Sequence, residues 1–311
     1  MNFPMMKFPP EQVSSINLYK DEELLMRIHA QGDANAYLPK VEKTYGKIIL
    51  PKGKDYPYLF ASIALSMDGK MAYPDNLDGD MLVHSNTQNP DGALADFYIL
   101  NVLRAYSDAV LIGTKSMINE ANEWITIYDE DLIRDRKEHM KNKEEQPFTI
   151  VASKDGTDIP FDHLLFQQTE IPVLVFTSPA GYLHISKEAG DKFYLLGKIS
   201  KEAIYTLDGR IPVVVTGQDD QTSFKPFMRS MKKAGFDHIM VESPMINWLL
   251  MKEGLLNEYF ITYSSIFVGG TFSPGSFSPF TFEDHAQSQV AYLNRHGNSF
   301  FFTRQILQEE K

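Results

Sequence analysis

The sequence contains no cysteine, and its apolar stretches are short. The missing thiols exclude disulfides, thiolate metal ligands and cysteine nucleophiles. Residues 1–10 hold no continuous apolar segment of signal-peptide length, and no later stretch is long enough to span a membrane without a polar interruption. These absences favour a soluble, cytoplasmic protein that has no membrane partner.

Positive charge is also scarce. The chain has 30 Lys and Arg residues and 41 Asp and Glu residues, which gives a formal net charge of −11. An acidic surface repels polyanions, so we expect no nucleic-acid partner. The eight histidines are scattered and lack the close spacing that zinc sites use. We therefore predict no metal site.

Several motifs of nucleotide-binding and hydrolytic enzymes are missing as well. The chain has no Gly-x-Ser-x-Gly elbow, which argues against an α/β-hydrolase nucleophile. It has neither a Gly-x-x-x-x-Gly-Lys-Ser/Thr loop nor a Gly-x-Gly-x-x-Gly fingerprint. Neither a P-loop enzyme nor a standard Rossmann dehydrogenase is indicated.

The chain does contain enough apolar side chains for a sizeable core, since 43% of its 311 residues are hydrophobic. Short apolar runs alternate with helical periodicity, as in an α/β fold with a mostly parallel sheet. We expect strands at 58–66, 108–112, 149–152, 173–176, 193–196, 212–216, 237–241 and 259–268, helices at 90–106, 224–234 and from 244, and a closing hairpin of 289–293 with 299–303.

The pattern changes near residue 58, so we predict an N-terminal extension at 1–57 and a main domain at 58–311. Residues 21–29 have the acidic first turn and apolar spacing of a short helix. A helix that packs on the main body is the favoured interpretation, and a lid or a dimer arm is the alternative. The charged segment 119–146 predicts a solvated helix and loop.

Two turns from strand to helix are candidates for binding an anion. Ser243 is a favoured N-cap residue after the strand at 237–241, and Pro244 fits the first helical position. Gly113 forms a similar turn after the strand at 108–112. The N–H groups and the positive dipole end at such helix starts bind phosphate. An ordinary turn is the alternative for Gly113, because many α/β proteins have one.

A series of short motifs follows in order along the chain: Ser66-Met67-Asp68-Gly69-Lys70, Leu103-Arg104-Ala105, Asp108-Ala109-Val110-Leu111-Ile112-Gly113, Val241-Glu242, Leu255-Leu256-Asn257-Glu258 and Gly269-Gly270. Together they resemble the reductase domain at the C-terminal end of the bifunctional riboflavin-biosynthesis deaminase-reductase, a relative of dihydrofolate reductase. The resemblance covers roughly residues 58–270. It implies a dihydrofolate reductase-like three-layer sandwich with a mixed, mostly parallel sheet and a C-terminal antiparallel hairpin.

The resemblance also implies an activity. Members of this family transfer a hydride from NADPH to a ribosylamino-pyrimidine phosphate, and they are usually homodimers. By position, Gly113, Thr114, Ser116 and Ser243 are expected to bind NADPH. The catalytic residues implied in the same way are Asp68 and Glu242, and those beside the heterocyclic substrate are Ser62, Ser85, Arg104 and Glu120.

Some of these positions also have a purely structural interpretation. Asp68 precedes a glycine and would then only close a tight turn. Arg104 lies near a helix end, where a solvated cation is favoured. The family has two glycines after its glutamate, whereas this chain has Ser243 and Pro244, and Pro244 has no N–H to offer. A non-catalytic nucleotide- or ligand-binding protein that retains the reductase fold is therefore the alternative function.

Overall fold

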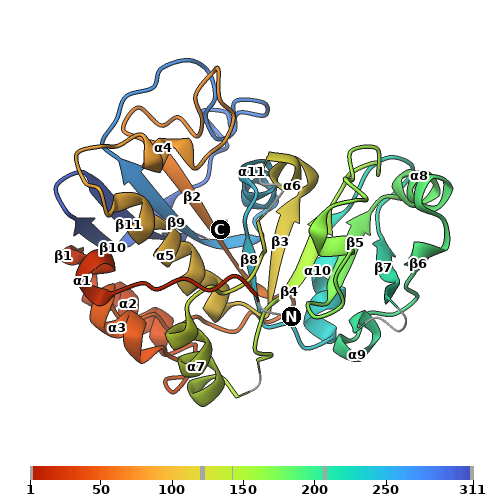
Figure 1. Cartoon of the computed structure of the whole chain (residues 1–311), viewed down its shortest axis with the longest axis horizontal. Helices are drawn as coiled ribbons and strands as arrows, with labels where there is room; N and C mark the ends of the chain where they lie inside the picture. Colours follow the sequence, from red (N-terminus) through yellow and green to blue (C-terminus); the bar gives the residue numbers. More distant parts are fainter. Residues whose placement is uncertain (1–2, 120–122, 142, 206–208, 309–311) are drawn as a thin grey trace.

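A computed structural model describes residues 3–119, 123–141, 143–205 and 209–308 of the chain. One eleven-stranded sheet runs across the molecule in the order β1-β10-β11-β9-β2-β8-β3-β4-β5-β7-β6 (Figure 1). Its strands are β1 (Ile16–Lys20), β2 (Tyr58–Ser66), β3 (Ala109–Gly113), β4 (Phe148–Ala152), β5 (Val173–Thr177), β6 (Phe193–Leu195), β7 (Ile211–Val215), β8 (His238–Val241), β9 (Leu256–Ser264), β10 (Ser288–His296) and β11 (Phe300–Leu307). Neighbouring strands from β9 to β6 are parallel, and β9, β11, β10 and β1 are antiparallel to one another in that order.

Helices cover both faces of this sheet. They are α1 (Pro10–Val13), α2 (Glu22–His29), α3 (Pro39–Thr44), α4 (Met81–His84), α5 (Gly92–Tyr106), α6 (Thr114–Asn119), α7 (Glu130–His139), α8 (Pro179–Ala189), α9 (Lys201–Ile204), α10 (Phe224–Lys233) and α11 (Pro244–Lys252), with short 3₁₀ turns η1 (Leu164–Phe166) and η2 (Gly190–Lys192). Apolar residues of α5 and α7 share a core with one face, and those of α9, α10 and α11 share a core with the other. The result is a three-layer α/β sandwich.

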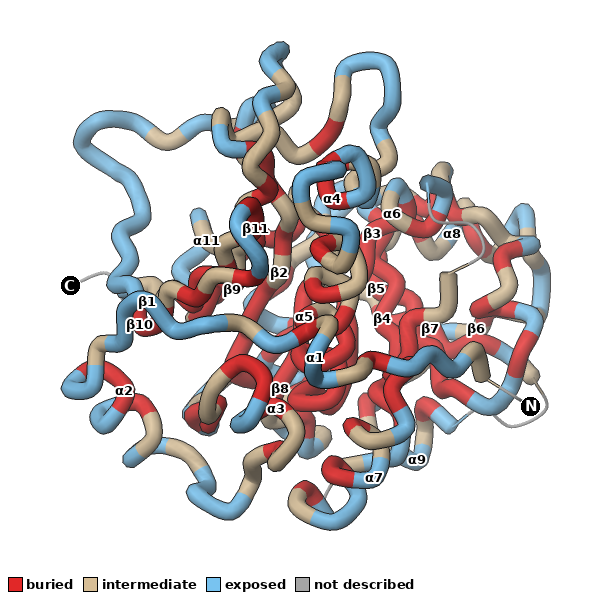
Figure 2. The backbone as a smooth tube through the Cα atoms, turned by 60° about the vertical axis from the view of Figure 1, so that its left-hand side comes forward, coloured by how far each residue is buried: buried red, intermediate tan, exposed pale blue. Residues whose placement is uncertain are grey.

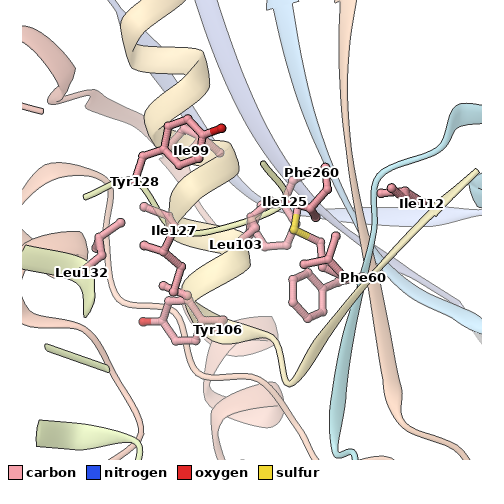
Figure 3. Packing of buried hydrophobic residues seen from close by; sticks show 14 of the residues in the cluster. Phe60, Ile99, Leu103, Tyr106, Ile112, Ile125, Ile127, Tyr128, Leu132 and Phe260 are labelled. Carbon is pink, nitrogen blue, oxygen red and sulfur yellow. The ribbon is translucent and has the colours of Figure 1, made fainter. Parts of the chain in front are cut away.

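The central strands are apolar along their whole length because both of their faces are covered. In β2, Phe60 points to the core around α5, whereas Leu59 and Ala61 belong to the opposite core. Figure 3 shows Phe60 among Leu103 of α5 and Phe260 of β9. Burial is greatest in these central strands and falls toward the edge strand β1 (Figure 2).

The N-terminal residues are built into the same body. β1 pairs with β10 and extends the sheet by one strand. Asp21 caps α2 by accepting a hydrogen bond from the Leu24 N–H at 2.9 Å, and the buried face of α2 packs on β10. The predicted helix that packs on the main body is thus confirmed. The domain boundary at residue 57 stays a prediction.

Two local predictions were wrong. The strand predicted at 259–268 lies at Leu256–Ser264, because its pairing with β2 begins at Leu256 and ends at Ser264. The charged segment 119–146 is not wholly solvated, because Arg136 is fully buried. Its guanidinium donates hydrogen bonds to the carbonyls of Ala105 and Ser107 at the end of α5. Within the described residues, no helix combines the length and apolarity needed to cross a membrane.

Candidate functional site

The two predicted helix starts lie side by side at one edge of the sheet (Figure 1). β3 and β8 are adjacent and parallel, so α6 and α11, which follow them, begin at the same edge. A Cβ atom placed on Gly113 would lie 2.9 Å from the Ser243 Oγ. The Ser116 hydroxyl donates to the Glu242 carbonyl at 3.4 Å. The structure therefore brings Gly113, Ser116 and Ser243 together, and glycine at 113 allows this close approach.

The start of α11 is open on its first turn. Ser243 occupies the N-cap position as predicted and Pro244 is the first helical residue, but the Ser243 side chain forms no capping hydrogen bond. The first N–H groups of a helix have no intrahelical partner. Because Pro244 has no N–H, the first two donors that α11 offers at this edge are those of Met245 and Ile246.

The Thr114 side chain forms a hydrogen bond within the fold. Its side chain is buried, and the hydroxyl donates to the Asp158 Oδ2 at 2.6 Å. Ser153 donates to the other oxygen of the same carboxylate at 2.8 Å. The Thr114 hydroxyl thus fixes the segment that follows β4.

Arg104 is the centre of a buried ion-pair network. Its guanidinium donates through Nε and Nη2 to the two oxygens of Glu242, at 2.8 and 2.7 Å. Nη2 also donates to Glu123 at 2.9 Å, and Nη1 donates to the Thr126 carbonyl at 3.0 Å. Arg104 is fully buried, so the expectation of a solvated charge at the end of a helix was wrong. The cause is the pair of carboxylates, which compensates the cost of burying the cation.

The ion pairs of this network keep Arg104 and Glu242 charged. Burial alone would lower the pKa of Arg104, but Glu242 and Glu123 together raise it. Burial raises the pKa of Glu242, and the bidentate guanidinium opposes that rise. We assign Glu242 as ionised, because each of its oxygens accepts a charge-assisted hydrogen bond.

Asp68 joins two loops at the same edge of the sheet. The predicted tight turn is confirmed, since the Ser66 N–H donates to the Lys70 carbonyl at 2.9 Å. The Asp68 carboxylate accepts hydrogen bonds from the Ser66 hydroxyl at 2.6 Å and from the N–H groups of Val268 and Gly269 at 3.0 and 2.7 Å. These donors, led by Ser66, lower the pKa of Asp68 to about 2. Asp68 therefore does more than close its own turn, because it ties the end of β2 to the loop after β9.

The remaining predicted substrate residues are less tightly placed. Ser62 lies on β2 and is partly exposed. Ser85 follows α4, is exposed, and shares a hydrogen bond of 2.8 Å with the Tyr73 hydroxyl. Glu120 lies outside the described residues.

Sequence reasoning missed one acidic side chain of the Arg104 network. Glu123 is the second carboxylate on the guanidinium, and the sequence carries no signal for that contact.

These features define an α/β protein with three layers, in which helices cover both faces of one mixed sheet. A charged site lies at the carboxyl edge of β2, β3 and β8. The family model described as the RibD C-terminal domain matches residues 57–298. The chain belongs to the RibD C-terminal domain family. The predicted resemblance and the predicted fold class are both confirmed.

Solved structures with the same fold have low sequence identity to this chain. RibD of Acinetobacter baumannii is 13% identical at a TM-score of 0.55, with 86% of this chain and 60% of that chain covered. A pyrimidine reductase-like protein of Corynebacterium diphtheriae is 16% identical at a TM-score of 0.57, with 82% of this chain and 93% of that chain covered. The riboflavin biosynthesis reductase of Saccharomyces cerevisiae is 14% identical at a TM-score of 0.52, with 92% of this chain and 100% of that chain covered. The chain thus spans about three fifths of the Acinetobacter protein's length. No curated protein matches it.

Proposed function

We propose that this protein is an NADPH-dependent reductase that transfers a hydride to a ribosylamino-pyrimidine phosphate or a related heterocycle. Membership of the RibD C-terminal domain family supports the reaction class. The observation that carries the proposal is the contact between Gly113 and Ser243, which sets two helix starts against each other at one edge of the sheet. Homodimer formation and a cytoplasmic location belong to the same proposal.

The residues at this edge fit a dinucleotide diphosphate. Gly113 lets the start of α11 lie close to the start of α6, and α11 begins without a side-chain cap from Ser243. Backbone N–H groups at α6 and α11 would bind the diphosphate, with the Ser116 and Ser243 hydroxyls beside them. When bound, NADPH supplies the hydride.

Glu242 and Asp68 then have separate tasks. Glu242 is held in place by Arg104 and keeps the end of β8 rigid beside the cofactor site. Asp68 is ionised near neutral pH because its pKa is about 2, so it does not donate a proton there. In this proposal Asp68 orients the loops around the substrate, and solvent or another group delivers the proton that accompanies the hydride.

Titration of the purified protein with NADPH, followed by nicotinamide fluorescence, tests the proposal. We expect saturable binding, and NADPH oxidation when the ribosylamino-pyrimidine phosphate is added. No binding at millimolar NADPH would contradict the reductase assignment. Light scattering checks the dimer, whose mass is expected to be about twice the 35.5 kDa of the chain.

Pro244 favours a second function, that of a non-catalytic nucleotide- or ligand-binding protein. Its missing N–H removes one donor from the start of α11. The double variant Ser243→Gly with Pro244→Gly restores that donor, so the reductase proposal expects tighter NADPH binding. NADPH oxidation by the unaltered protein would rule out the non-catalytic function.

A further inference from the structure

Residues 3–8 form an N-terminal arm that leads to the candidate site. The arm lies before residue 57, where the match to the RibD C-terminal domain begins. Figure 1 shows it in red, crossing α5 on the way to α1. The contacts of the arm are therefore a feature of this chain outside the matched domain.

The arm contacts the segment 123–128, which lies between α6 and α7. The ring of Phe3 meets the ring of Trp124 edge to face, with centroids 5.7 Å apart. The Met6 N–H donates to the Tyr128 carbonyl at 2.8 Å. Within the segment, the Trp124 N–H donates to the Tyr128 hydroxyl at 3.0 Å. The arm thus holds the segment near both of its ends.

Helix α5 contacts the same segment. The Tyr128 N–H donates to the side-chain oxygen of Asn101 at 2.6 Å. Phe97 meets Tyr128 edge to face, with centroids 5.2 Å apart, and it also contacts Phe8 of the arm at 5.9 Å. The arm and α5 therefore hold the segment together, so the contacts of the arm bear directly on its position.

The same segment supplies acceptors to Arg104. Glu123 accepts from Nη2 at 2.9 Å, and the carbonyls of Trp124 and Thr126 accept from Nη1 at 3.3 and 3.0 Å. Trp124 thus contacts the arm through its ring and Arg104 through its carbonyl. Glu123 also lines a small cavity with Ser116 of α6. Because the three acceptors belong to one short segment, a displacement of the segment moves all of them together.

We propose that the N-terminal arm positions the candidate site through residues 123–128. Phe3 and Met6 are the positioning residues, and Arg104 is the group on which they act. Because Arg104 also holds Glu242 just after β8, the arm affects the edge of the sheet where NADPH is proposed to bind. The effect on Arg104 stands without the proposed function, whereas the effect on NADPH rests on it.

Phe3→Ala tests this inference in the full chain, and Phe3 is only partly buried, so the variant is expected to fold. Loss of the ring pair is expected to speed exchange of the Trp124 and Tyr128 amide hydrogens about twofold to tenfold. The Arg104 Nε–H, followed by NMR, is expected to exchange faster by a similar factor, because the guanidinium loses acceptors. Phe3→Tyr keeps the ring and is expected to keep the original rates.

Met5→Ala is the matched control, because Met5 lies in the same arm and is 39% exposed. It is expected to leave these exchange rates unchanged. The amides of the central strand β4 are the internal reference, and Phe3→Ala is expected not to affect them. Unchanged exchange of the Arg104 Nε–H in Phe3→Ala would overturn the inference. An equal acceleration of the β4 amides would also overturn it, since that result means a loss of global stability only.

NADPH tests the same coupling from the other direction. If docking of the arm favours NADPH binding, then NADPH favours docking by the same factor. Phe3→Ala is expected to raise the NADPH Kd about twofold to tenfold, and saturating NADPH is expected to slow exchange of the Met6 N–H at least about twofold. A Met6 N–H whose exchange does not respond to saturating NADPH would contradict the coupling. Failure of NADPH to bind at all would instead contradict the reductase proposal and leave the Arg104 test intact.

Discussion

At the scale of single residues, two fully buried arginines are each compensated by specific carboxylates. Arg104 pairs with Glu242 and Glu123, and Arg304 of β11 pairs with Glu258 of β9 at 2.7 Å with both side chains fully buried. Replacing one partner leaves an uncompensated charge in a low-dielectric interior. The charges of the candidate site are thus mutually dependent.

Glu242→Gln is expected to reduce the free energy of unfolding by about 3 kcal/mol, the lower end for a broken buried pair, because Glu123 still neutralises Arg104. Urea denaturation measures the change. The control is Glu145→Gln, whose ion pair with Lys137 is exposed, and it is expected to cost less than about 1 kcal/mol. A loss in Glu242→Gln no larger than in the control would show that the network does not stabilise the fold.

His238 gives the protein a predictable response to acid. Burial and the nearby Lys143 ammonium lower its pKa to about 4, although Asp108 and Asp237 oppose the shift. Its partners fit a neutral ring, in which Nε2–H donates to the Pro51 carbonyl at 2.9 Å and Nδ1 accepts from the Lys143 ammonium at 3.3 Å. The unfolded chain takes up a proton near pH 6.5 and the folded chain does not, so stability falls as the pH drops from about 6.5 to about 4.

This residue is expected to account for up to about 3 kcal/mol of the acid-induced loss. Urea denaturation at several pH values measures it. His238→Gln has no proton to take up and is expected to flatten the pH dependence in that window. The exposed His285→Gln control is expected to leave the slope unchanged. An unchanged slope in His238→Gln would mean that the ring is already protonated in the fold.

At the scale of elements, the N-terminal segment is part of the main core. Phe8 is buried with its ring centroid 5.9 Å from Phe97 and 5.7 Å from Tyr98, both in α5. α5 carries Arg104, so this contact supports the helix that positions the ion-pair network. Residues 3–57 therefore support the site through α5.

Phe8→Ala is expected to reduce the free energy of unfolding by about 3–5 kcal/mol, because it opens a cavity against α5. Met5→Ala is the control and is expected to change it by less than about 0.5 kcal/mol, since Met5 is 39% exposed. Chemical denaturation of both variants measures the difference. Equal values would indicate a dispensable N-terminal segment.

Elements with a local signal were predictable from the sequence. Pro244 and Gly113 mark their turns through backbone chemistry, and the apolar runs of β2 to β8 reflect burial on both faces. The burial of Arg104 was not predictable, because its partner Glu242 lies 138 positions away and only the fold brings them together. The hydrogen bond from the Thr114 hydroxyl to Asp158 was not predictable for the same reason, since Asp158 lies on another connection.

At the scale of the whole molecule, the antiparallel and parallel parts of the sheet have different roles. The antiparallel strands β1, β10 and β11 extend one side, and the parallel strands from β9 to β6 bring their carboxyl ends to one edge. That edge gathers the two helix starts, the loop tied down by Asp68 and the Arg104 network. Ligands of open α/β sheets bind at such carboxyl edges.

The central claim is that the starts of α6 and α11 together bind a dinucleotide diphosphate. The most direct measurement is a crystal structure of the protein with NADPH. The account predicts the diphosphate beside the starts of α6 and α11, within hydrogen-bonding distance of backbone N–H groups on both helices. A cofactor bound elsewhere, or none bound at millimolar concentration, would contradict it.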